Sequence, residues 1–125
     1  MAREGLLADF VALIDDDAPV RLALTFSLEA GGYAVDAFGD GESALASSSG
    51  PARWRCLIVD YRLPGLSGLD VLEQLRERQW QAPGVLITSW PTQATCARAA
   101  RVGVPVLEKP ILDDALLRWV QRAMS

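Results

Sequence analysis

The chain has 125 residues, half of them hydrophobic, and a formal net charge of −4 at pH 7, so we expect one domain with a buried core and no direct nucleic-acid binding. It contains no histidine, which excludes histidine-based acid–base catalysis and histidine metal sites. Its apolar runs are too short to span a bilayer and no leader pattern opens it, which predicts a cytoplasmic protein without membrane association.

Short apolar runs alternate along the chain with segments of helical periodicity. The first run, Phe10–Ile14, predicts a strand buried on both faces. Pro19 suits the first turn of the helix that follows, and Gly31 and Gly32 end that helix. Residues 33–38 alternate as in a strand, and residues 40–50 predict a short helix that leads into a loop.

The second half of the chain continues this alternation. Strands are predicted at 56–60, 84–89 and 104–110, and helices at a segment carrying Leu69, Leu72 and Leu75, at 91–101, and at a last segment lined by Leu116, Val120 and Met124. Five strand–helix units predict a parallel sheet with helices on both faces. Because proline is tolerated only in edge strands, Pro105 predicts that the fifth strand lies at an edge. Residues 1–8 fit no element and are expected to form an N-terminal extension of a domain that spans 9–125.

Polar side chains follow four of the five predicted strands. These residues are Asp15 and Asp16, Asp60, Thr88 and Lys109. The carboxyl ends of parallel strands share one edge of the sheet, so these side chains are expected to meet there. A single acid after a strand is more often a helix cap, but three carboxylates held together require a cation. All-oxygen ligands favour Mg²⁺, Mn²⁺ or Ca²⁺, and a few carboxylates with open positions fit Mg²⁺.

Two residues near these strand ends have distinct expected roles. Asp17, the third acid of the run, is placed to cap the helix that begins at Pro19. Lys109 is the only lysine in the chain, against eleven arginines. A compact ammonium on a flexible stem can point at one phosphoryl oxygen where a guanidinium would be bulky, so this lysine favours a phosphoryl site.

Four motifs occur in a recognisable order and spacing: LIDDD, LIVDYRLPGLSGLD, VLITS and EKP. Thr88 follows Asp60 by 28 residues and Lys109 follows it by 49. Over about residues 9–125 the chain therefore resembles the receiver domain of two-component response regulators. The resemblance implies an α/β flavodoxin-like (βα)5 fold, a three-layer sandwich around a parallel sheet of order 2-1-3-4-5. That order also places the fifth strand at an edge.

The resemblance assigns roles to the acidic residues. Asp60 would be the phosphoacceptor, attacking the phosphohistidine of a histidine kinase or a histidine phosphotransfer protein. Mg²⁺, with Mn²⁺ as the alternative, would bind Asp16, Asp60 and the backbone carbonyl of Arg62, and Asp15 would act mainly through water. Such a domain is a signalling phosphoacceptor that catalyses its own phosphorylation, not an enzyme that acts on a separate substrate.

The resemblance also implies a switch around the phosphoryl group. Lys109 would contact the transferring group, and Thr88 would hydrogen-bond it once it is attached. The peptide bond before Pro110 would be cis and aim the lysine inward. The family usually has Tyr or Phe where this chain has Val106, so the usual aromatic reporter is missing. Trp90 stands at a position that tunes phosphoryl lifetime in the family.

The output is expected to run through the face made by the fourth helix, the fifth strand and the last helix. The family uses this face for partners, and the resemblance admits a phosphorylation-dependent homodimer. Trp119 on the last helix lies near the edge of the apolar stripe of that helix. Two interpretations stay open: Trp119 anchors a partner, or it packs against the flank of its own domain.

Other functions fit the sequence less well. An aspartate-based phosphatase would need a second acid two residues after Asp60, where this chain has Arg62. A flavin-binding module would need a phosphate loop rich in Ser, Thr and Gly after the first strand. The main alternative is a receiver-like interaction module that no longer depends on phosphorylation, which Val106 favours. The sequence leaves open whether the chain is a stand-alone receiver or a fragment of a longer regulator.

Overall fold

The computed structural model describes residues 10–48, 50–111 and 114–125. Its strands are β1 (Phe10–Ile14), β2 (Ala34–Phe38), β3 (Trp54–Asp60), β4 (Gly84–Thr88) and β5 (Val106–Glu108). Its helices are α2 (Ala18–Ala30), α3 (Gly41–Ala46), α4 (Gly50–Arg53), α5 (Gly68–Glu77), α6 (Gln93–Arg101) and α7 (Ala115–Met124). The strands form one parallel sheet of order β2-β1-β3-β4-β5, which confirms the predicted topology.

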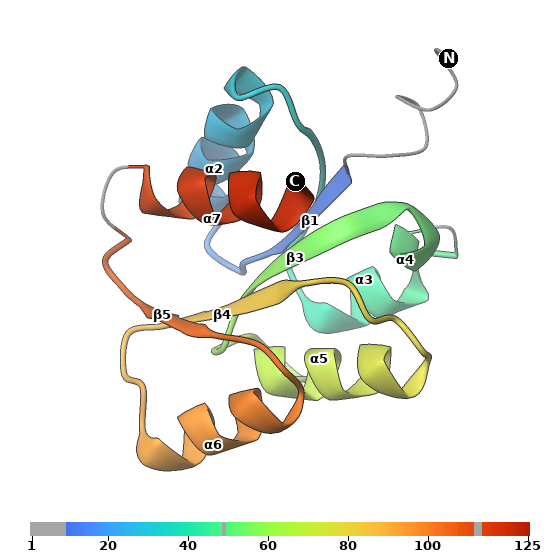
Figure 1. Ribbon diagram of the computed structural model, residues 1–125, viewed down its shortest axis with the longest axis vertical. Coiled ribbons are helices and arrows are strands. Elements are labelled where there is room, and N and C mark those ends of the chain that lie inside the picture. The colour runs from blue at the N-terminus through green and yellow to red at the C-terminus, as the bar shows by residue number, and fades with distance from the viewer. Residues whose placement is uncertain (1–9, 49, 112–113) are drawn as a thin grey trace.

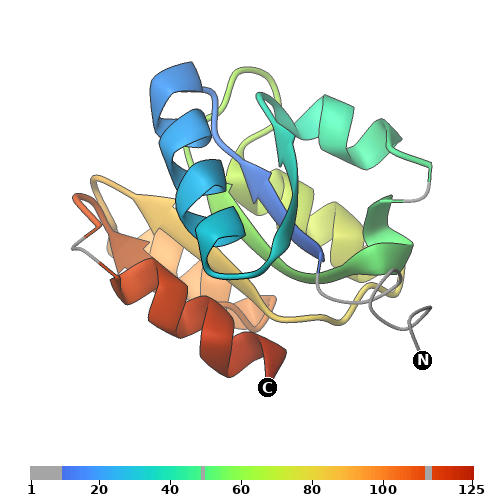
Figure 2. The same ribbon diagram turned by 90° about the horizontal axis from the view of Figure 1, so that it is seen from above.

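Helices cover both faces of the sheet and complete a three-layer sandwich (Figure 1). Helices α2 and α7 lie over one face, as the view from above also shows (Figure 2), and enclose a buried cluster that includes Leu28, Ile58 and Val120. Helices α3, α5 and α6 lie over the other face, where a second cluster includes Leu72 and Leu86. Strands buried on both faces explain why β1, β3 and β4 are almost wholly apolar.

Side chains cap the helices that start at the carboxyl edge of the sheet. Hydrogen bonds from the first turns of α2, α3, α5 and α6 are accepted by Asp17, Asp40, Ser67 and Thr92. These caps satisfy amides that the helix leaves unpaired and so fix where each helix begins. Asp17 is therefore a helix cap, as the sequence predicts.

The connection before β3 differs from the sequence prediction. The helix predicted at 40–50 ends at Ala46, and the short helix α4 precedes a β3 that starts at Trp54, two residues earlier than expected. The ring of Trp54 is buried, and its indole N–H donates to Asp36 of β2 at 2.8 Å. Arg53 forms an ion pair with the same carboxylate at 2.8 Å. This contact between β2 and β3 extends the strand beyond its apolar run.

The fifth strand is shorter than predicted and lies at the predicted edge. It covers only Val106–Glu108, because Pro105 cannot donate a ladder hydrogen bond. The carbonyl of Pro105 still accepts from the N–H of Leu86 at 3.0 Å, which joins the start of the strand to β4. The extension predicted at residues 1–8 lies outside the described residues. Within the described ranges, none of the helices is long and apolar enough to cross a membrane.

Candidate functional site

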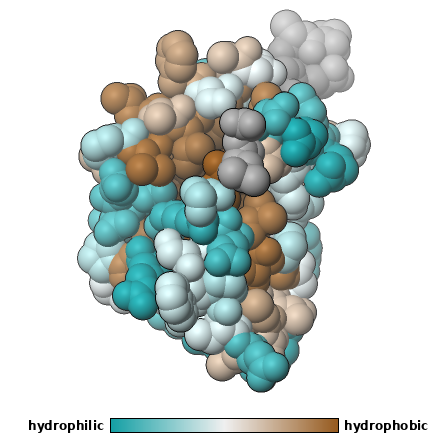
Figure 3. Space-filling view, turned by 90° about the vertical axis from the view of Figure 1, so that its left-hand side faces the viewer, coloured by the Kyte–Doolittle hydropathy of each residue, from teal (hydrophilic) through white to brown (hydrophobic). Residues whose placement is uncertain are grey.

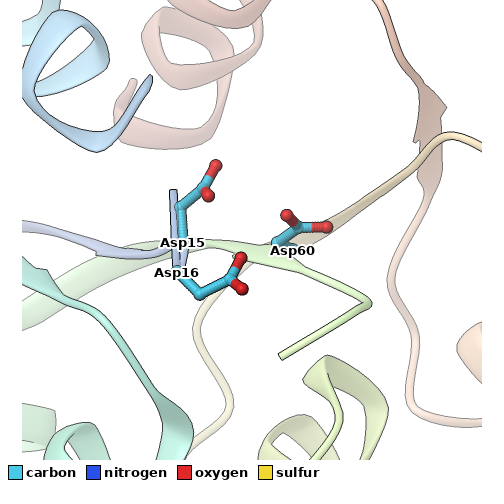
Figure 4. A group of neighbouring side chains, drawn as sticks. All are labelled: Asp15, Asp16 and Asp60. Carbon is cyan, nitrogen blue, oxygen red and sulfur yellow. The ribbon is translucent and has the colours of Figure 1, made fainter. Parts of the chain in front are cut away.

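Three carboxylates meet where β1 and β3 end (Figure 4). The two strands are neighbours, with Ile14 opposite Val59, so Asp15 and Asp16 follow β1 beside Asp60, the last residue of β3. One oxygen atom from each of the three carboxylates lies within 4.8 Å of the others. Asp15 and Asp60 are buried, whereas Asp16 is exposed. Asp16 is therefore the member of the cluster that faces solvent most directly.

Lys109 brings a positive charge to this cluster. Its Nζ atom lies 2.9 Å from Oδ2 of Asp60. Its backbone N–H donates to the carbonyl of Thr88 at 2.9 Å, which holds Lys109 beside the end of β4. The Lys109–Pro110 peptide bond is cis, as predicted. Burial works to lower the pKa of Lys109, but the hydrogen bond to Asp60 and the nearby acids outweigh it, so the pKa is raised. Lys109 is accordingly a cation at neutral pH.

Asp15 is fixed by contacts from the start of α2. Its Oδ1 accepts from the N–H of Asp17 at 2.9 Å, and Arg21 donates to its carbonyl oxygen at 2.7 Å. Burial raises the pKa of Asp15; the N–H of Asp17 opposes this effect, and the charge of Asp60 adds to it. The contact of Arg21 with Asp15 was not predicted from the sequence. The one feature that could have indicated it is the position of Arg21 in the first turn of the helix that follows the acidic run.

The charges and donor atoms at this edge fit a divalent metal ion. Three carboxylates and one ammonium leave an excess of negative charge, and oxygen donors with open coordination positions are what Mg²⁺ prefers. Arg62 and Asp16 line the same open cavity of about 520 Å³. The turn that carries Arg62 is held by hydrogen bonds from Tyr61 to the carbonyl of Ile87 at 2.8 Å and from Gly68 to the carbonyl of Tyr61 at 2.9 Å.

The other residues to which the sequence analysis assigned a role lie at the end of β4, on β5 and on α7. Thr88 ends β4 and is buried, and its hydroxyl oxygen accepts from the N–H of Trp90 at 3.2 Å. The Trp90 side chain is 77% exposed. Val106 is half-buried on β5 and packs against the core cluster under α5 and α6. Trp119 is half-buried and packs against the cluster under α2 and α7, which agrees with the flank interpretation.

An apolar hollow of about 500 Å³ lies beside the acids. Its lining includes Val20, Leu24, Pro110 and Ile111 together with Asp15 and Lys109. Figure 3 looks onto this side of the molecule and shows hydrophobic side chains gathered in its upper left part, with hydrophilic ones directly below them. Helix α2 also exposes Leu22 and Phe26, at 72% and 73%. The charged site thus borders an apolar surface.

Comparison with known proteins agrees with this geometry. The sequence model of the response regulator receiver domain family matches residues 11–121. The transcriptional regulatory protein FixJ of Bradyrhizobium diazoefficiens is 32% identical over 91% of this chain and 56% of its own length. Nodulation protein W of the same organism is 37% identical over 90% and 50%, and the C4-dicarboxylate transport regulator DctD of Pseudomonas aeruginosa is 36% identical over 92% and 25%. The chain thus spans about half or less of these relatives.

Solved structures show the same fold. A CheY-like receiver domain protein from Methanospirillum hungatei superposes with a TM-score of 0.86 at 19% identity, covering 94% of each chain. The chemotaxis protein CheY4 of Vibrio cholerae superposes with a TM-score of 0.82 at 26% identity, covering 93% of this chain and 98% of its own. Together with the family match over residues 11–121, these likenesses place the chain in the response regulator receiver domain family of two-component systems.

Proposed function

We propose that this receiver domain accepts a phosphoryl group on Asp60 from a phosphohistidine of a kinase or phosphotransfer protein, in a reaction that requires Mg²⁺. The observation that carries the proposal is the setting of Asp60, a buried carboxylate 2.9 Å from Lys109 and within one cluster with Asp15 and Asp16. An attacking oxygen, a cation for the transferred group and oxygen ligands for a metal are thereby within reach of one another.

The proposed step transfers phosphorus from nitrogen to oxygen. A carboxylate oxygen of Asp60 forms a bond to phosphorus, the P–N bond breaks, and its electron pair stays on the nitrogen of the donor imidazole, which leaves as a neutral ring because its other nitrogen carries a proton. Lys109 stabilises the negative charge on the phosphoryl oxygens as they leave the donor. Thr88 would donate a hydrogen bond to the group after transfer. The product is an aspartyl phosphate and a neutral donor histidine.

The acidic residues would hold the metal beside this reaction. Asp16, Asp60 and the backbone carbonyl of Arg62 would be ligands of Mg²⁺, and Asp15 would act mainly through a bound water. When bound, the metal neutralises charge on the phosphoryl group. Two contacts support this role for Asp15: its carboxylate accepts from the N–H of Asp17, and Arg21 donates to its backbone carbonyl.

The reception of the signal and its output would use different surfaces. A protein donor would approach the open edge where the acids lie, and α2 offers it the exposed side chains of Leu22 and Phe26. The output would run through the face made by α6, β5 and α7. Trp119 contributes to that face only in part, because it packs against its own domain.

Labelling with a radioactive small phosphodonor in Mg²⁺ tests the assignment of Asp60. The parent should incorporate label, and Asp60→Asn or chelation of the metal should abolish it, because the nucleophile or the metal is then missing. Asp17→Asn is the matched control, since it removes one charge from the same acidic run but keeps a side chain that caps α2. Labelling of Asp60→Asn at the level of the parent and of Asp17→Asn would contradict the assignment.

A further inference from the structure

Thr88 and Asp60 end neighbouring strands, but their side chains leave the sheet on opposite faces. In the register of β3 and β4, Asp60 pairs with Ile87, and the side chains of paired residues share a face. Ile87 belongs to the cluster under α2 and α7, so Thr88 points toward the face that α5 and α6 cover. To reach a phosphoryl group on Asp60, the Thr88 hydroxyl has to swing over the end of β4.

Trp90 is tied directly to this hydroxyl. The N–H of Trp90 donates to the Thr88 hydroxyl oxygen at 3.2 Å. Only residues 89–92 connect β4 to α6, so a connection this short transmits a displacement of Thr88 along its backbone. A swing of Thr88 toward Asp60 therefore either breaks this hydrogen bond or moves Trp90 with it.

The surroundings of Trp90 leave room for such a movement. Its side chain is 77% exposed and borders a hollow of about 230 Å³ that is also lined by Ser89, Pro91 and Glu108. Glu108 pairs with Thr88 across β4 and β5, so the hollow adjoins the strand end that would move. Val106, on the same face of β5, is small and already packed against the core. Among the residues that line this hollow, Trp90 has the largest apolar side chain, and its indole ring could occupy the hollow.

We infer that Trp90 reports the phosphorylation of Asp60 in this chain. When Thr88 turns to bond the phosphoryl group, the 89–92 connection shifts and the indole closes over the hollow against the Glu108 side chain. The apolar area of a tryptophan makes that closed position favourable once the loop permits it. This inference rests on the proposed function of Asp60, and it assigns to Trp90 the aromatic role that Val106 cannot take.

Tryptophan fluorescence in a Trp119→Phe background tests the inference, with beryllofluoride and Mg²⁺ standing in for the phosphoryl group. Trp54 and Trp80 are 3% and 8% exposed, so acrylamide quenches mainly Trp90, and a Trp90→Phe sample supplies the background. Fluorine NMR measures how much beryllofluoride is bound, independently of the fluorescence. At full occupancy the quenching constant of Trp90 should fall roughly twofold, because the ring becomes buried.

Variants at Thr88 test whether the hydroxyl carries the response. At equal occupancy, Thr88→Val should remove the change in quenching and Thr88→Ser should keep it, since Ser retains the hydroxyl. Bound beryllofluoride with unchanged quenching, or a full response in Thr88→Val, would overturn the inference and leave Asp60 as the acceptor. A parent chain that binds no beryllofluoride would overturn the proposed function and the inference with it.

Discussion

Gly68 allows helix α5 to begin directly against the end of β3. A β-carbon at this position would overlap the backbone carbonyl oxygen of Asp60. Because neither backbone can give way cheaply, Gly68→Ala should lower the free energy of unfolding by about 1–3 kcal/mol. It should also reduce phosphodonor labelling, since the turn after Asp60 has to shift. Urea unfolding and labelling at saturating Mg²⁺ measure the two effects.

Gly103 provides the matched control at the residue scale. It has a φ of 74°, and a β-carbon there would meet no atom within 4 Å. Gly103→Ala should therefore cost only the strain of the left-handed conformation, about 1–2 kcal/mol. Since Gly103 precedes β5 at the far end of the sheet from the acids, labelling should be unchanged. Loss of labelling in both variants to the same degree would show that general destabilisation, not the position of Asp60, is responsible.

At the scale of elements, α5 depends on a capping box at its first turn. The Ser67 hydroxyl accepts from the N–H of Asp70 at 3.1 Å, and the Asp70 carboxylate accepts from the N–H of Ser67 at 2.9 Å. Ser67→Ala should lower the free energy of unfolding by about 1 kcal/mol, because one helix amide loses its partner. Ser48→Ala, at an exposed serine in the turn after α3, is the control and should change it little. Similar losses in the two variants would argue against the cap.

The capping box also makes the free energy of unfolding depend on pH. The N–H of Ser67 lowers the pKa of Asp70 below its ordinary value of 3.8. The ionised carboxylate therefore contributes stability at pH values above the ordinary pKa, and this contribution is lost as the pH falls through the lower pKa of the folded state. The capping box consequently contributes least to the stability of the domain at acidic pH.

The order of the elements could be predicted from the sequence, because each buried strand is a continuous apolar run that ends at a polar residue. The same strand ends predicted the meeting of Asp15, Asp16, Asp60 and Lys109. The start of β3 could not be predicted in this way, since it depends on the contact between Trp54 and Asp36, which lie 18 residues apart and meet only in the folded chain. The packing of Trp119 likewise depends on how α7 sits on the sheet.

At the scale of the whole molecule, the proposed metal site predicts that stability depends on Mg²⁺. The acidic cluster keeps an excess of negative charge beside the one ammonium of Lys109, and a ligand that binds only the folded state stabilises it. Mg²⁺ at ten times its Kd should raise the free energy of unfolding by about 1.4 kcal/mol relative to a chelated sample. Thermal unfolding with Mg²⁺ and with chelator measures this difference.

Asp16→Asn separates the metal effect from a general effect of salt. The variant loses one repelling charge at an exposed position of the proposed metal site, so in chelator it should be at least as stable as the parent. It should also lose most of the stabilisation by Mg²⁺, whereas Asp17→Asn should keep it. An undiminished Mg²⁺ effect in Asp16→Asn would place the ion elsewhere.

The edge position of β5 bears on how reliably the domain receives its signal. The strand has three residues and, among the described strands, pairs only with β4, yet it leads directly to the only lysine of the chain. Fraying of this strand would withdraw the ammonium from Asp60 while the rest of the sheet stays folded. Under the proposed function, the fraction of molecules able to accept a phosphoryl group would then depend on local opening at this edge, so substitutions in β5 that leave the melting temperature unchanged should still change the rate of labelling.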